Sequence, residues 1–249
     1  MTTSSNMYGE ALKGYGPVPP KQGIYEISET QKAVLGQRLE FADGRIFRYA
    51  KAGATDLAPG KLCKAGVVNN ANCLNDIMAA AVTVGSKSLT LVTSSAVTTG
   101  AEGWLQINDV DGEGIMYKIE KTAANATTST STDITLYDPI ATALTTSSQG
   151  TIIFNSYEQV EVCSAITDII LGVPPVTVTA EYYFWIQTWG VACVLSEGIT
   201  PAGQVVEVAI GDGVAGVTTC NADSALGVGV QMLVGVDTEY KPVSLRINP

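Results

Sequence analysis

Apolar and polar side chains alternate with a period of two along most of the chain beyond residue 38. The alternation is regular in residues 86–94, 103–110, 133–139 and 150–157. Successive side chains of a β-strand point to opposite faces, so this pattern predicts strands with one buried face. Glycine and proline interrupt the pattern roughly every eight to twelve residues, which is typical of an all-β sandwich or barrel.

Local signals add two expectations to this pattern. Residues 38–53 alternate around Asp43-Gly44, a dipeptide that favours a β-hairpin turn. Residues 69–83 are rich in asparagine and alanine, and there we expect one short helix.

The first part of the chain has a different composition. Residues 1–35 contain closely spaced glycine and proline, which favour neither helix nor sheet. We interpret them as an extended N-terminal arm that is either a disordered tail or becomes ordered on a partner. In the second case Tyr8, Tyr15 and Pro17 are the anchor candidates.

The fold class expected for the rest is all-β, with two small β-barrel or β-tulip-like units. Our first division places one unit at 36–160 and the other at 161–249. A weak similarity between the Pro/Gly turns of the two halves supports it. The alternative inserts residues 75–155 into a barrel built from 40–70 and 160–249.

Composition excludes several functions. The net charge is −10 and the chain has only 14 Lys and Arg, so neither nucleic acid nor an anionic membrane is an expected partner. The sequence contains no histidine, which removes Ser-His-Asp and Cys-His catalysis and every His-ligated metal site. We expect no cofactor, no small-molecule substrate, no enzymatic activity, no secretory signal and no transmembrane segment.

The cysteines are odd in number and widely spaced, without a C-x-x-C pair. They are Cys63, Cys73, Cys163, Cys193 and Cys220. This spacing supports neither a zinc site nor a disulfide framework. We expect buried free thiols in a reducing compartment.

The most site-like cluster is the acidic sequence NDVDGEG at 108–114. Asp109, Asp111 and Glu113 offer oxygen ligands of the kind that Ca²⁺ prefers, so they form a weak metal-site candidate. The segment is too short for an EF-hand loop. The competing interpretation is a hairpin turn in which Asp-Gly supplies the positive φ.

The aromatic stretch YYFWIQTW at 182–189 is the second candidate site. Strand alternation places Tyr183, Trp185, Gln187 and Trp189 on one face, and large side chains also occupy the other. The core of the same domain can bury one of these apolar faces. We expect a neighbouring domain or a second copy of the chain to pack on the other. Stacking on a sugar or a nucleobase is the alternative.

Two arginines near the predicted hairpin complete the set of candidates. Arg45 and Arg48 lie beside Phe47 and Tyr49, in the combination of arginine and aromatic residues that interfaces favour. We expect this hairpin to face a partner, unless it is a solvated surface turn of mixed charge. The interface candidates are Tyr8, Tyr15, Pro17, Arg45, Arg48, Tyr183, Trp185 and Trp189.

Four stretches together resemble a family of tailed-phage virion structural proteins: 41–62, 103–148, 182–209 and 235–249. The C-terminal region is also similar to the small β-barrel or β-tulip type of capsid decoration protein. The resemblance implies a homotrimeric cement protein on the outer capsid surface, made in the cytoplasm of the host bacterium, with the major capsid protein as partner. This chain is much larger than the simplest decoration proteins, and a second β unit would account for the difference.

Two other functions compete with this expectation. A carbohydrate- or receptor-binding module, as in a head fibre or adhesin, would use Trp185 and Trp189 for stacking and residues 108–114 for Ca²⁺. A glycosidase-like enzyme with two carboxylates is the weakest, because no carboxylate pair stands out.

Overall fold

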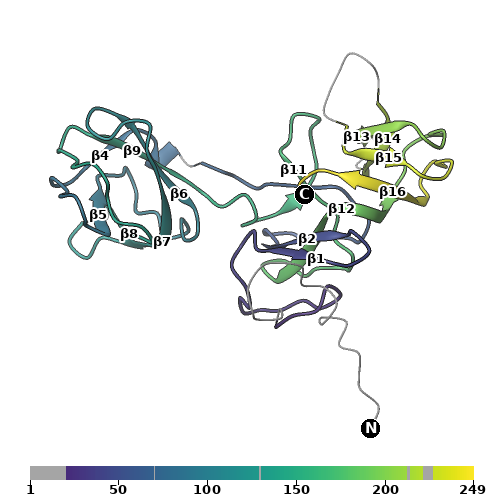
Figure 1. Ribbon diagram of the computed structural model, residues 1–249, viewed down its shortest axis with the longest axis horizontal. Helices are drawn as coiled ribbons and strands as arrows, with labels where there is room; N and C mark the ends of the chain where they lie inside the picture. Colours follow the sequence, from purple (N-terminus) through teal and green to yellow (C-terminus); the bar gives the residue numbers. More distant parts are fainter. Residues whose placement is uncertain (1–20, 70, 129, 212–213, 221–226) are drawn as a thin grey trace, which may run out of the picture. The chain divides into compact units, whose positions relative to one another are not determined.

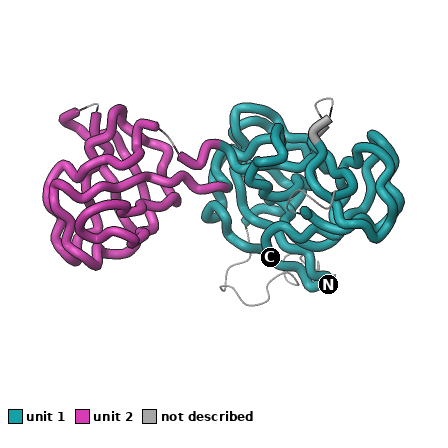
Figure 2. The backbone as a smooth tube through the Cα atoms, turned by 90° about the horizontal axis from the view of Figure 1, so that it is seen from above, with its two compact units in different colours: residues 1–66, 157–249 teal, residues 67–156 magenta. Residues whose placement is uncertain are grey.

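The structure is a computed structural model that describes residues 21–69, 71–128, 130–211, 214–220 and 227–249. The chain is all-β, which confirms the fold class that the alternation predicts. It divides into two compact units (Figure 2). Unit 1 contains residues 1–66 and 157–249, and unit 2 contains residues 67–156.

This division differs from our first expectation, which placed the boundary between the units at residue 160. It lies near the alternative, in which residues 75–155 are inserted into a barrel formed by the flanking segments. The reason is one long-range strand pairing. β2, Ile46–Lys51, pairs antiparallel with β12, Tyr183–Leu195, so the segment before residue 66 belongs with the end of the chain. Pairing between distant segments leaves no signal in either local pattern.

Unit 2 is a nearly closed, barrel-like sheet of six strands in the order β4-β9-β6-β7-β8-β5 (Figure 1). The strands are β4 Asp76–Ile77, β5 Ser88–Leu91, β6 Trp104–Asp109, β7 Met116–Ala124, β8 Thr132–Leu136 and β9 Gln149–Ile153. A bridge between Met78 and Leu91 brings the two end strands together, and the Ala79 amide donates to the Thr90 carbonyl at 2.9 Å. This closure leaves little unpaired edge.

The interior of unit 2 follows the predicted alternation. Leu105 and Ile107 of β6, Ile119 of β7 and Leu136 of β8 are fully buried. Burying each such side chain contributes about 1.5–3 kcal/mol, so the alternate positions supply much of the stability of this unit. The helix expected in 69–83 is a single 3₁₀ turn at Ala71–Cys73.

Unit 1 is built on a seven-stranded sheet in the order β1-β2-β12-β16-β15-β13-β14. Its remaining strands are β1 Arg38–Glu40, β13 Val205–Gly211, β14 Val214–Thr219, β15 Gly229–Gln231 and β16 Tyr240–Arg246. The edge strand β14 contacts the end of β12 through a parallel bridge between Val217 and Ser196. The sheet therefore curls around a second core that includes Val194, Val208 and Leu245.

A short three-stranded sheet completes unit 1. It consists of β3 Cys63–Lys64, β10 Glu161–Val162 and β11 Ile170–Gly172, with β3 in the centre. The hairpin expected around Asp43-Gly44 is confirmed, since β1 pairs with β2 and Gly44 has a φ of 85°.

The arm expected over residues 1–35 is shorter than the composition suggests. Residues 1–20, with Tyr8, Tyr15 and Pro17, lie outside the described residues. From Gln22 onward the chain belongs to unit 1: Ile24 is buried, Ser28 bridges to Tyr183, and the Gly36 amide donates to the Tyr49 carbonyl at 2.8 Å.

All five cysteines are free thiols, as the spacing predicts. Cys63, Cys73 and Cys163 are buried, whereas Cys193 is exposed and Cys220 is half-buried. Burial raises the pKa of Cys63 well above its usual range and that of Cys163 to about 12. These two thiols are therefore poor nucleophiles.

Asp76 makes the stability of unit 2 dependent on pH. Burial raises its pKa to about 6, and its Oδ2 has no hydrogen-bond partner among the described residues. Because the folded-state pKa exceeds the ordinary value near 4, proton binding stabilises the fold. This contribution is fully present below about pH 4 and is lost as pH rises through about 6.

We expect Asp76→Asn to stabilise unit 2 at pH 8 by about 1 kcal/mol, since the neutral amide avoids the cost of a buried charge and partial exposure reduces that cost. Hydrogen exchange of the paired β4 and β9 amides measures this stability. The gain should disappear at pH 4. Asp138→Asn, at an exposed position of the same unit, is the control, and an equal gain at both pH values would contradict the assignment.

Candidate functional site

The aromatic strand β12 is sealed by the segment that follows Lys21. Trp185 is 1% exposed, packs edge-on against Tyr49 with ring centroids 5.0 Å apart, and donates its Nε1 hydrogen to the Gln22 carbonyl at 2.9 Å. The Gln22 side chain accepts from the Tyr49 hydroxyl and donates to the carbonyls of Glu26 and Tyr183, each at 2.8 Å. We call this arrangement the Gln22 clasp.

The Gln22 clasp corrects the interpretation of Trp185 as an interface residue or a stacking platform. Its ring lies in the core of unit 1, and its only polar atom already has a partner. Tyr183 is half-buried and stacks on Tyr49 with centroids 6.0 Å apart, so it supports the same core.

A β-bulge moves Trp189 away from the face predicted for it. Gln187 pairs with Phe47, but Trp189 pairs with Ile46, so the strand gains one residue at Thr188. Paired residues share a face of the sheet, and Ile46 and Phe47 face opposite sides. Trp189 therefore does not lie on the Trp185 side.

The opposite face of β12 is also covered by the chain itself. Phe184 and Ile186 are fully buried, and the Thr188 hydroxyl donates to the Asn248 carbonyl. The sequence analysis expected another domain or subunit to bury the second face of this strand. Residues of unit 1 bury it instead.

The two hairpin arginines have different surroundings. Arg45 forms an ion pair with Asp43 at 2.7 Å, and its guanidinium lies 5.1 Å from the ring centroid of Phe41. It is half-buried at the tip of the hairpin. Gly190 permits this close approach: it has a φ of 84°, and a Cβ there would lie 3.0 Å from the Cα of Arg45.

Arg48 holds parts of unit 1 together. It donates to the Gly36 carbonyl at 3.1 Å, to the Asn248 side chain at 3.2 Å and to the Pro249 carbonyl at 2.7 Å. Its two terminal nitrogens are used in this way, and its buried Nε has no hydrogen-bond partner among the described residues, so Arg48 is a structural residue more than a partner-facing one.

The acidic segment 108–114 forms the turn between β6 and β7. Asp111 accepts from the Thr145 hydroxyl at 3.0 Å, and Asp109 accepts from the amide of Val110 at 2.9 Å. Within the described part of the chain, no three acidic, cysteine or histidine side chains gather as metal ligands. Asp109, Asp111 and Glu113 therefore do not form a metal site here, and the hairpin-turn interpretation holds.

A surface that the sequence did not indicate lies at one end of the curled sheet. Two loops, 196–204 and 231–239, are joined by backbone hydrogen bonds, from the Gly235 amide to the Thr200 carbonyl at 2.7 Å and from the Gln231 amide to the Gln204 carbonyl at 2.9 Å. They expose five large aliphatic side chains: Ile199, Met232, Leu233, Val234 and Val236. We call these five residues the loop-pair surface.

The loop-pair surface is unusual in its degree of exposure. Ile199 is 78% exposed, Leu233 58% and Val234 54%. Acidic residues border it, and Asp237 accepts from the Gly198 amide at 2.8 Å. The sequence signal is the short apolar run QMLVGV at 231–236, which periodicity alone does not distinguish from a strand.

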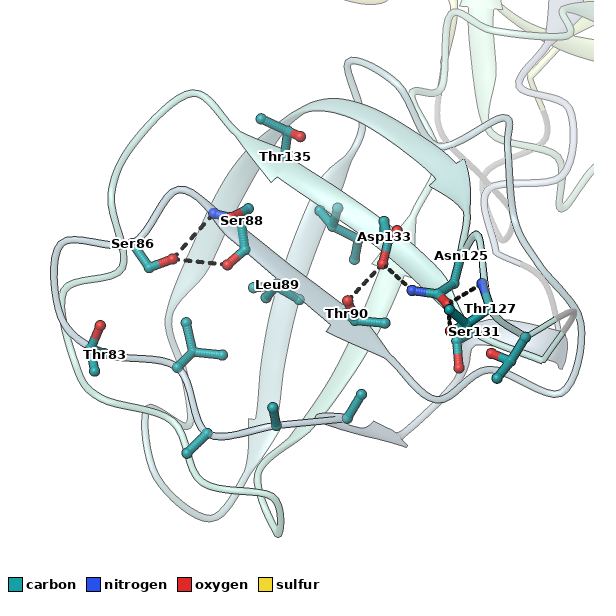
Figure 3. Close-up of a pocket in the computed structure, with 16 residues that line it drawn as sticks. Thr83, Ser86, Ser88, Leu89, Thr90, Asn125, Thr127, Ser131, Asp133 and Thr135 are labelled. Carbon is teal, nitrogen blue, oxygen red and sulfur yellow. Dashed lines mark hydrogen bonds between the residues drawn. The ribbon is translucent and has the colours of Figure 1, made fainter.

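Unit 2 carries a pocket of about 710 Å³ lined mainly by hydroxyl and short aliphatic side chains (Figure 3). Thr90 of β5 and Asn125 of the loop before β8 both donate to Oδ1 of Asp133, at 2.6 and 2.8 Å. Asn125 in turn accepts from Thr127. Among the described residues, the lining contains a carboxylate, an amide and several hydroxyl groups, but no aromatic ring.

Comparison of the chain with protein-family models, curated proteins and solved structures found no match. No helix among the described residues is long and apolar enough to cross a membrane.

We expect Gln22→Ala to destabilise unit 1 by about 1–3 kcal/mol, because the buried Tyr49 hydroxyl loses the oxygen that accepts its hydrogen, whereas the Lys32 and Ser28 amides still donate to the Tyr49 hydroxyl and the Tyr183 carbonyl. Urea unfolding followed by tryptophan fluorescence measures the change. Lys21→Ala, at an exposed neighbouring position, should leave the unfolding midpoint unchanged. Equal midpoints for the two variants would show that the Gln22 clasp contributes little.

Proposed function

We propose that this protein is a non-enzymatic structural component of a tailed-phage virion, which binds and stabilises the outer surface of the icosahedral capsid. The sequence resemblance suggests the class. The observation that carries the proposal is the loop-pair surface, which exposes five aliphatic side chains at neighbouring positions. Contiguous apolar patches with a polar rim are typical of protein-binding surfaces.

The proposed mechanism is thermodynamic. The loop-pair surface would lie on apolar positions of the major capsid protein that become contiguous when the shell has expanded. A ligand that binds only the assembled, expanded shell stabilises it by mass action. If the chain acts as a homotrimer, three weak contacts add through effective concentration.

The N-terminal residues would supply further contacts. Tyr8 and Tyr15 are the anchor candidates there, and Gln22, which accepts a hydrogen bond from Trp185, already belongs to the core of unit 1. A deletion that tests the arm must therefore end at residue 20. A deletion of residues 1–35 would remove the Gln22 clasp as well.

We expect the full chain to co-sediment with expanded capsids of its phage and not with unexpanded ones. The double variant Leu233→Glu, Val234→Glu should weaken binding at least about tenfold, because it removes two aliphatic contacts worth about 1.5–3 kcal/mol each when buried. Both positions are exposed, so the fold should be retained, as circular dichroism can check.

The double variant Val67→Glu, Val84→Glu is the matched control, since it places the same two charges at other exposed aliphatic positions. Equal loss of binding in both variants would remove the loop-pair surface from the proposal. A wild-type chain that sediments with neither form of the capsid would refute the cement function itself.

A second candidate function is carbohydrate or receptor binding, favoured by the pocket around Asp133. Stacking on Trp185 is excluded by its burial, but carboxylate, amide and hydroxyl groups in one hollow can bind sugar hydroxyls through hydrogen bonds.

Glycan-array screening of the full chain tests this second candidate. We expect Asp133→Asn to lower the affinity for any captured glycan about tenfold, since a charge-assisted hydrogen bond contributes about 1.5–3 kcal/mol. Asp138→Asn, outside the pocket, should bind like the wild type. Failure of the wild type to capture any glycan would eliminate this function.

A further inference from the structure

Unit 1 contains a groove of about 430 Å³ lined by tyrosine and proline side chains. Tyr25 and Tyr240 are 58% and 46% exposed, and Val191 and Cys193 of β12 are also exposed. We call this groove the Tyr25–Tyr240 groove.

The walls of the groove are held by backbone contacts. Gly60 donates to the Pro174 carbonyl at 3.1 Å and accepts from the Leu195 amide at 2.9 Å. The ring of Tyr240 lies against Gly60, where a Cβ would be 2.6 Å from it. Val173 and Gln187 exchange two backbone hydrogen bonds of 2.9 Å. The groove is therefore preformed.

These surroundings suit a proline-rich peptide. Prolyl rings pack on tyrosine faces, and a polyproline II segment loses little conformational entropy when it binds. Such a segment has no internal hydrogen bonds, so its carbonyls are free to accept. No hydrogen bond is recorded for the hydroxyls of Tyr25 and Tyr240 among the described residues, which leaves both as donors for those carbonyls.

The chain itself contains such a peptide shortly before Tyr25 in the sequence. Residues 15–20 read YGPVPP, and they are followed directly by Lys21 and the anchored Gln22. Tyr25, three residues beyond Gln22, is part of the groove wall. A six-residue polyproline II segment extends about 19 Å, enough to run along one side of a groove of this kind.

We infer that residues 15–20 of the chain dock in the Tyr25–Tyr240 groove of the same molecule. The docked segment would cover Cys193 and direct residues 1–14 away from a fixed point on unit 1. This inference does not depend on the virion function, because it concerns the isolated chain.

The reactivity of Cys193 tests the docking directly. We compare the rate of maleimide labelling at Cys193 in the full-length wild type and in the full-length variant Pro17→Ala, Pro19→Ala, Pro20→Ala, and locate the label by peptide mass spectrometry. The variant should label about tenfold faster, as expected when a tethered segment at millimolar effective concentration is released from a weak site.

Three controls test whether a change in the labelling rate of Cys193 comes from release of residues 15–20. Tyr8→Ala, outside the docking segment, should label like the wild type. Cys220, half-buried and outside the groove, should react at one rate in all chains. Adding a synthetic peptide of residues 12–20 to the triple variant should restore protection of Cys193.

Equal Cys193 rates in the wild type and the triple variant, or a peptide that gives no protection, would overturn the inference. The protection must also be independent of protein concentration. Protection that increases with concentration would show exchange of the segment between copies and would overturn the intramolecular form stated here.

Discussion

The structure of unit 1 depends on the pairing of β2 with β12 and on the Gln22 clasp that seals it. The pairing joins residues near positions 50 and 185. The clasp then satisfies the polar atoms of Trp185 and Tyr49 in a site without access to water. An unpartnered polar group there would cost about 1–3 kcal/mol, so the segment after Lys21 is as necessary to the core as the strands.

The same arrangement explains how unit 2 fits into the sequence. β3 and β10 flank the insertion and pair antiparallel through Lys64–Glu161 and Cys63–Val162. The chain therefore leaves unit 1 and returns to it at adjacent positions, which is the geometry that domain insertion requires. Gly66 permits the close crossing, since a Cβ there would lie 2.3 Å from the Gln159 carbonyl oxygen.

The alternation of apolar and polar residues predicted those features of the fold that depend on neighbouring residues alone. The strands β5, β6, β8 and β9 and the turn at Asp43-Gly44 follow from alternation and turn chemistry. The bulge at Thr188 could not be predicted, because one extra residue reverses every later side chain without changing the composition. The carboxylates of 108–114 alternate in sequence, but a tight turn directs them to different partners, which no spacing rule anticipates.

Aromatic and aliphatic side chains differ in their exposure in unit 1. The aromatic residues, which offer the largest apolar areas, are placed mainly where a second segment of the same chain covers them, as Trp185 shows. Within the described part of the chain, no such segment covers the aliphatic residues of the loop-pair surface, although the same loops bury Ser196, Thr200 and Gln231 completely. A loop that buries polar side chains and exposes aliphatic ones reverses the usual order of a folded surface. This reversal, more than aromatic density, is the reason why the loop-pair surface is proposed as the partner-binding part of unit 1.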